Sequence, residues 1–163
     1  MKPWRRAWDD GTTAGAVASI LSASVLALAS KKEAGSACSC LNATSHWIWG
    51  DGAALHDAPS LRHTAVGYLI HHAASCFWGV LYERGLGEQL EEAPAVAKVG
   101  AGMAAAAFAC VVDYRMVPHR LSPGFELRLS RGSIVAGYVA FGLGLALPGI
   151  LRAGKARSRV AAP

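Results

Sequence analysis

The most constraining feature of this 163-residue sequence is the distribution of its charged residues. Only 17% of the residues are charged, and they collect at the two ends and in three short segments between them. A soluble helical domain would instead mix charged and apolar residues at helical spacing along each helix. The segregation leaves four long stretches almost free of charge. These stretches are residues 11–30, 63–82, 94–112 and 132–151.

Each stretch has the length of a helix that crosses a membrane. The apolar core of a bilayer is about 30 Å thick, and roughly 20 helical residues span it. None of the stretches shows the apolar–polar alternation of a barrel strand. The sequence therefore predicts an all-α protein, a bundle of four transmembrane helices that forms a single membrane domain over residues 1–163. A flexible tail is expected at residues 155–163.

The first stretch has a second interpretation, because it also resembles a cleavable signal peptide. Lys2, Arg5 and Arg6 precede an apolar run that ends near Ala27-Leu28-Ala29, an order that is typical of secretory signals. The acidic pair Asp9-Asp10 interrupts that order, and the apolar run is long. We therefore expect a retained helix.

Small residues recur every four positions along the predicted helices. Gly15, Ser19 and Ala23 follow this spacing in the first helix, and Gly100 and Ala104 follow it in the third. In lipid, such faces let helix backbones approach one another closely. The pattern favours a tightly packed bundle. The glycine-rich runs are not preceded by the strand that a dinucleotide site requires.

The connecting segments after the first and third helices contain ordered features. Trp47 and Trp49 suit the headgroup zone of a membrane. Leu121, Phe125 and Leu129 form an apolar stripe at helical spacing. We therefore expect short interfacial helices in both segments. A partner subunit or lipid headgroups could dock on Trp47, Trp49, Arg120 and Phe125. Anchoring to the bilayer alone is the simpler interpretation. The chain could also associate with a second copy of itself.

The second helix holds most of the polar groups within the apolar stretches. Tyr68, His72 and Cys76 follow one another at a spacing of four and share one face, and His71 lies on the adjoining face. Polar groups are costly inside a membrane, so these faces should point into the bundle. Two interpretations stay open. An intramembrane histidine can relay protons, or it can only hydrogen-bond a neighbouring helix.

A proton relay would have to extend from these residues to both ends of the bundle. Glu83 ends the second helix and Asp113 ends the third. Antiparallel helices would place these carboxylates at opposite sides of the membrane. His72 lies about 16 Å from Glu83 along the helix, at 1.5 Å per residue. That distance exceeds a hydrogen bond, so side chains and waters would have to bridge it.

Metal or haem binding is a further alternative, although the sequence requires no cofactor. Cys38, Cys40 and His46 lie close together in the chain, and thiolates with imidazole suit copper(I) or zinc. The spacing matches no zinc-finger pattern, so loop thiols without a metal are the simpler interpretation. A haem with two axial histidines would need a dimer or an inward-facing His119, because no other predicted helix has an internal histidine.

The net charge of +5 does not indicate a nucleic-acid partner. The basic residues lie beside apolar stretches, where such residues anchor a protein to lipid headgroups. Of the 16 Lys and Arg residues, nine fall on the side of the termini and seven on the other. This balance leaves the orientation nearly open, and the basic termini lead us to expect them in the cytoplasm. The stretches contain no nucleophile elbow, phosphate loop or buried acid pair.

The second helix also supports a family resemblance. Residues 67–83 read Gly-Tyr-Leu-Ile-His-His-Ala-Ala-Ser-Cys-Phe-Trp-Gly-Val-Leu-Tyr-Glu. Together with the small-residue first helix at Gly15–Leu28, this segment resembles small bacterial inner-membrane proteins of the YagU-like kind. The resemblance implies four helices in a bacterial inner membrane and brings no activity with it.

The residues thus favour a non-enzymatic membrane protein. We expect an accessory or structural subunit of a larger assembly, or a bundle that associates with itself. The first alternative is an ion or proton relay through Tyr68, His71, His72 and Cys76. The second alternative is a metal- or haem-binding membrane protein.

Overall fold

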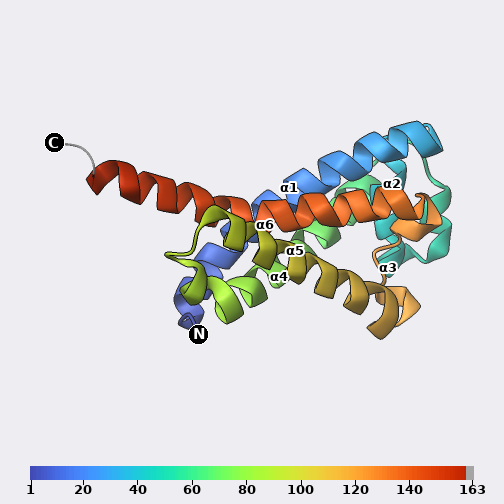
Figure 1. Cartoon of the computed structure of the whole chain (residues 1–163). Coiled ribbons are helices and arrows are strands. Elements are labelled where there is room, and N and C mark those ends of the chain that lie inside the picture. Colours follow the sequence, from blue (N-terminus) through green and yellow to red (C-terminus); the bar gives the residue numbers. More distant parts are fainter. Residues whose placement is uncertain (161–163) are drawn as a thin grey trace.

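The computed structural model describes residues 1–160, and over that range the chain forms helices and no strand. This confirms the predicted all-α class. Four long helices run along an elongated bundle (Figure 1). They are α1 (Trp4–Ala34), α4 (Val66–Leu90), α5 (Ala95–Val111) and α6 (Arg131–Val160).

The first connecting segment contains short α-helices, as predicted, whereas the third contains only short 3-10 turns. Both segments lie at the end of the bundle that is opposite to the N-terminus (Figure 1). We call them together the cap, defined as residues 36–65 and 117–130. The first contains α2 (Ser39–Thr44), α3 (His46–Trp49), the 3-10 turn η1 (Asp51–Leu55) and the π-turn η2 (Leu61–Ala65). After the π-turn η3 (Val112–Met116), the second contains the 3-10 turns η4 (His119–Leu121) and η5 (Phe125–Leu127).

The long helices extend beyond the apolar stretches from which they were predicted. α1 begins seven residues before Gly11 and ends at Gly35, whose φ of 79° suits the left-handed cap of a helix. α6 continues through Val160. Residues 155–160 of the predicted tail are therefore helical, and residues 161–163 lie outside the described part of the chain.

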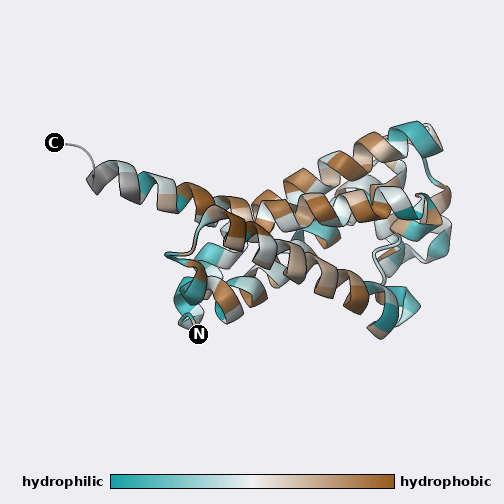
Figure 2. Ribbon diagram, in the orientation of Figure 1, coloured by the Kyte–Doolittle hydropathy of each residue, from teal (hydrophilic) through white to brown (hydrophobic). Residues whose placement is uncertain are grey.

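Three helices in the described range are long and apolar enough to cross a membrane, rather than the four that were predicted. They are Trp4–Ala34, Ala95–Met116 and Arg131–Lys155. α4 is less apolar because it contains two adjacent histidines and, toward its end, Glu83, Arg84 and Glu88. Hydrophilic residues gather at the two ends of the bundle and apolar residues along its middle (Figure 2).

α1 is the helix around which the others are arranged. It packs against α4 and α6, and α5 packs on α6. The contact with α4 joins backbone to backbone: a Cβ added to Gly79 would lie 2.3 Å from the carbonyl oxygen of Gly11. A Cβ on Gly144 of α6 would lie 2.4 Å from the Cα of Ala18. Small residues therefore set the distances between these helices, as expected for packing in lipid.

The small-residue face of α5 differs from the predicted one by two positions. Gly100 and Ala104 are exposed. Gly102 and Ala106 are buried instead, and a Cβ on Gly102 would lie 2.3 Å from the carbonyl oxygen of Gly142 in α6. The run Gly-Ala-Gly-Met-Ala-Ala-Ala-Ala is small on every side, so spacing alone could not select the packed face.

The backbone contact between α1 and α4 predicts a large effect of one added methyl group. Replacing Gly79 by Ala should lower the free energy of unfolding by about 3 kcal/mol or more, the upper end for overpacking. Gly85 on the same helix is the matched control, because nothing lies within 4 Å of its added Cβ. Ala at that position should be neutral or stabilise by up to about 1 kcal/mol. Thermal unfolding in mild detergent measures both variants, and equal melting temperatures would contradict the contact.

Candidate functional site

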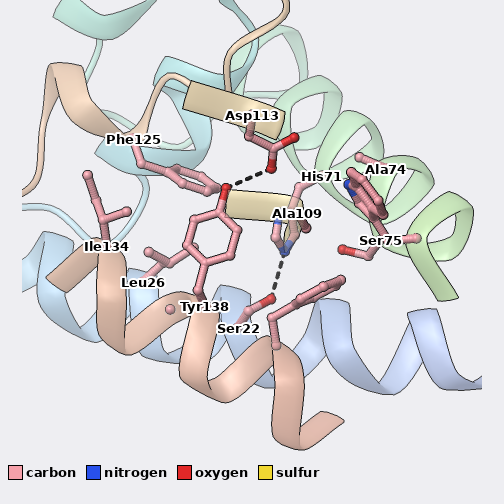
Figure 3. Close-up of a pocket in the computed structure, with 13 residues that line it drawn as sticks. Ser22, Leu26, His71, Ala74, Ser75, Ala109, Asp113, Phe125, Ile134 and Tyr138 are labelled. Carbon is pink, nitrogen blue, oxygen red and sulfur yellow. Dashed lines mark hydrogen bonds between the residues drawn. The ribbon is translucent and has the colours of Figure 1, made fainter. Parts of the chain in front are cut away.

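A partly open cavity lies between α1, α4, α5 and α6 (Figure 3). Its volume is about 50 Å³. One water needs at least about 10–15 Å³ by this measure, so the cavity has room for a few waters. Most of its lining is apolar. The polar side chains that line it are Ser22, His71, Ser75, Asp113 and Tyr138.

His71 and His72 of α4 both reach serines of α1. His71 Nε2 lies 3.0 Å from Ser22 Oγ and 3.3 Å from the carbonyl oxygen of Ser19. His72 Nδ1 lies 3.2 Å from Ser19 Oγ. Because glycines bring the two backbones together, short serine side chains are long enough to make these bonds.

The hydrogen bonds around His71 assign its tautomer. Ser22 donates its hydroxyl proton to the carbonyl oxygen of Ala18 at 2.7 Å, so Ser22 Oγ acts as an acceptor toward His71. The carbonyl of Ser19 can only accept. Nε2 of His71 therefore carries a proton, and in the neutral ring Nδ1 is the basic atom.

The predicted polar face of the second helix is present. The rings of Tyr68 and His72 have centroids 5.8 Å apart, and Cys76 Sγ lies 3.7 Å from His72 Nε2. This row of residues does not line the cavity, however. His71 on the adjoining face does, because the cavity lies between α4 and the α5–α6 pair.

Asp113 reaches the cavity from the π-turn η3, which follows α5. The hydroxyl group of Tyr138, on α6, donates a hydrogen bond to Asp113 Oδ2 at 2.7 Å (Figure 3). π-turns are frequent at functional sites, where they change the direction of side chains in a helix. Asp113 and His71, which the sequence places on different helices, thus share one cavity.

Phe125 closes the cavity on the side of the cap. Sequence reasoning placed it on a membrane-facing stripe with Leu121 and Leu129 and expected a partner contact there. Instead its side chain is buried, and its ring centroid lies 5.8 Å from that of His71. Leu129 is buried beside it and Leu121 is exposed. Two 3-10 turns with a bend between them replace the expected helix, so the stripe does not form.

Glu83 lies in a separate charged cluster at the other end of the bundle. Its carboxylate accepts hydrogen bonds from Lys2 at 2.7 Å and from Arg152 at 3.0 Å. Both cations also bind Asp10, at 2.6 and 3.1 Å. The side chains of Lys2 and Glu83 are only 3% and 4% exposed. Burial lowers the pKa of Lys2, but its hydrogen bonds and ion pairs with Asp10 and Glu83 outweigh this effect and raise the pKa.

An apolar layer separates this charged cluster from the central cavity. The cluster lines a larger cavity of about 380 Å³, to which Tyr82 and Leu145 contribute. Tyr82, Leu145 and Phe141 belong to one hydrophobic core, and Phe141 lines the central cavity. His71 and Glu83 are about 18 Å apart along α4. The predicted set of polar residues therefore falls into three groups rather than one: His71 and Asp113 at the cavity, the row of Tyr68, His72 and Cys76, and Glu83 in the charged cluster.

The suggested metal site of Cys38, Cys40 and His46 does not assemble. Cys40 is buried in α2, and this burial raises the pKa of its thiol to about 11. A metal ion would have to displace the proton of this buried thiol. His46 lies instead beside Asp51 and His119, the one group of potential metal ligands among residues 1–160.

The residues expected to contact a partner hold the cap together. Trp47 Nε1 donates to the carbonyl oxygen of Ser122 at 2.7 Å. Arg120 donates to the carbonyl oxygens of Trp47 and Ile48 at 2.8 and 3.1 Å. Trp49 donates to the carbonyl oxygen of Arg62 at 3.0 Å. These bonds connect the two segments of the cap with each other and α3 with η2, the turn that precedes α4.

Five residues of the two sites were not identified from the sequence. Ser19 was assigned only to packing and Ser22 was given no role. The two basic residues were assigned only to lipid anchoring. Only one sequence feature could have identified the tyrosine as a site residue, namely its hydroxyl group within an apolar stretch. These residues are Ser19, Ser22, Tyr138, Lys2 and Arg152.

No protein-family model, curated protein or solved structure matches the chain. The resemblance to YagU-like proteins therefore stays a prediction. Function has to follow from the residues of the two sites.

The charged cluster predicts a strong dependence of stability on Glu83. Replacing Glu83 by Gln leaves Lys2 with Asp10 and the half-exposed Glu91, and Arg152 with Asp10. Breaking a buried ion pair costs about 3–5 kcal/mol. Glu88→Gln is the control, because the Glu88 carboxylate is 60% exposed and pairs with the N-terminus. It should leave the melting temperature in detergent essentially unchanged. Equal effects of the two substitutions would show that the cluster does not stabilise the fold.

Proposed function

We propose that the chain is a multi-pass membrane protein that passes protons through the interior of its bundle. The observation that supports this is the cavity shared by His71 and Asp113. Imidazole and carboxylate groups take up and release protons, and within a membrane such groups mark proton pathways. Waters in the cavity would connect the two side chains.

The cavity lies near the middle of the bundle. Ser22 is 12 residues after Asp10 and 11 residues before Glu33 on α1. At 1.5 Å per residue, it is about 18 Å from the first carboxylate and about 16 Å from the second. The charged ends are thus separated by about the thickness of a bilayer core, with His71 halfway between them.

The proposal includes α4 as a fourth helix that spans the membrane. Three of its polar side chains bond within the bundle, since His71 and His72 face α1 and Glu83 binds Lys2. Its exposed large residues are apolar, among them Leu69 and Phe77. A helix with internally satisfied polar groups can cross a membrane despite a low mean hydropathy. We place the termini in the cytoplasm and the protein in a bacterial inner membrane.

The relay is gated rather than open. A proton reaches Asp113 from the side of the cap and passes through cavity water to Nδ1 of His71. His71 can then release the Nε2 proton toward Ser22. The apolar layer of Tyr82, Phe141 and Leu145 blocks the remaining path to Glu83. Conduction through the whole bundle therefore requires this layer to admit water.

A second candidate is the accessory subunit that the sequence favours. An apolar groove of about 340 Å³ between α4 and α5 supports it. The groove is lined by Trp78, Leu86 and Phe108 among others, and it could receive the helix of another membrane protein.

Proton flux in liposomes tests the relay. Vesicles that contain the protein, a pH-sensitive dye and an imposed potential should acidify faster than empty vesicles. His71→Phe removes the basic nitrogen and should reduce the flux by about 100-fold, the lower range for loss of a positioned proton-transfer group. Tyr138→Phe keeps the ring and removes the bond to Asp113, and it should also reduce the flux.

The control is His56→Ala, which changes an exposed histidine of the cap and should leave the flux unchanged. Melting temperatures in detergent verify that each variant folds. If the wild-type protein conducts no more than empty vesicles, the relay is excluded and the accessory subunit stands. If both site variants conduct like the wild type, His71 and Asp113 are not on the path.

A further inference from the structure

The cap contains a cluster of two histidines and an aspartate that the proton relay does not use. His46 comes from α3, Asp51 from η1 and His119 from η4. His46 Nδ1 lies 3.3 Å from Asp51 Oδ1, and His119 Nε2 lies 3.2 Å from each Asp51 oxygen. One potential ligand atom from each residue falls within 4.8 Å of the others. Residues from both segments of the cap thus converge on one point.

The hydrogen bond that His46 makes through Nε2 determines whether Nδ1 of the neutral ring carries a proton or a lone pair. His46 Nε2 lies 2.9 Å from the carbonyl oxygen of Ser122, which can only accept a hydrogen bond. Nε2 therefore carries the proton, and Nδ1 of the neutral ring presents a lone pair toward the carboxylate of Asp51. Two acceptors that face each other are stabilised by a positive charge between them, which is either a second proton on His46 or a metal ion. A histidine that binds a metal through one nitrogen usually donates the other N–H to a carbonyl or carboxylate in this way.

We propose that His46 Nδ1, Asp51 and His119 Nε2 bind a zinc ion. Zinc bonds to nitrogen and oxygen are about 2.0–2.1 Å long, so neighbouring ligand atoms of a tetrahedral site lie about 3.3 Å apart. The distances of 3.2 and 3.3 Å from the two imidazoles to Asp51 match this spacing. Two imidazoles with one carboxylate suit zinc, whereas calcium and magnesium prefer oxygen ligands alone.

The site has a buried side and an open side. His46 is fully buried, while the side chains of Asp51 and His119 are 61% and 59% exposed. The exposed imidazole can adjust by the small distance that closure around an ion requires. Three protein ligands leave the fourth position of the ion to a water on the open side. The ion cross-links segments that Trp47 and Arg120 already hold together.

Zinc binding to the purified protein tests the site. The protein is prepared with an affinity tag that lacks histidine, stripped with a chelator and titrated with zinc sulfate in detergent. The wild type should bind one zinc ion per chain, measured by calorimetry and by elemental analysis after dialysis. His119→Ala and Asp51→Asn should each weaken zinc binding at least about 100-fold. Loss of a residue that only hydrogen-bonds a metal ligand costs about 10–100-fold.

The controls separate loss of the site from loss of the fold. Both altered side chains are exposed, so the melting temperatures without metal should equal that of the wild type. His56→Ala removes another exposed histidine of the cap and should keep full zinc binding. A wild type that binds no zinc, or variants that bind it as tightly as the wild type, would overturn the proposal. Proton flux is measured separately, so neither result depends on the relay.

Discussion

The close packing of α4 on α1 is the constraint on which both polar sites depend. Gly11 and Gly15 let the backbone of α4 approach until the added Cβ of Gly79 would overlap α1. At this distance the serines of α1 reach the histidines of α4 without long side chains. The same contact brings the start of α1 to the end of α4, where Lys2 meets Glu83. Larger residues in the contact would separate these partners by more than a hydrogen bond can span.

The contact also explains how a polar helix can lie in an apolar bundle. An imidazole exposed to lipid would lose its bonds to water, and its burial is costly without a partner. His71 and His72 find hydroxyl and carbonyl groups on α1 instead. The face of α4 that points away from α1 carries Leu69 and Phe77, which lipid accommodates. The small residues of α1 thus allow the polar side chains of α4 to find partners inside the bundle.

The sequence predicts the helices better than it predicts their contacts. Helix positions follow from the separation of charged and apolar residues, a local pattern that needs no knowledge of neighbours. The choice of His71 over His72 depends instead on where α5 and α6 lie. The same is true of Tyr138, because its partner Asp113 is 25 residues away on another element. Phe125 shows the limit most clearly: its spacing suggests an interfacial helix, but Pro123 and Gly124 bend the chain and direct the ring inward.

The charges of the two polar sites suggest different roles. In the cluster at the end of the bundle, Lys2 and Arg152 balance Asp10 and Glu83, so each buried carboxylate has a cation beside it. Loss of a proton from these four groups would leave them with a net negative charge. The cavity has no Lys or Arg in its described lining, and Asp113 shares it only with neutral donors and His71. A proton that moves from one of these two groups to the other leaves the total charge of the cavity unchanged. A proton that enters the cavity meets no fixed cation there, whereas in the cluster it would meet Lys2 and Arg152, so neighbouring charge opposes proton uptake less in the cavity.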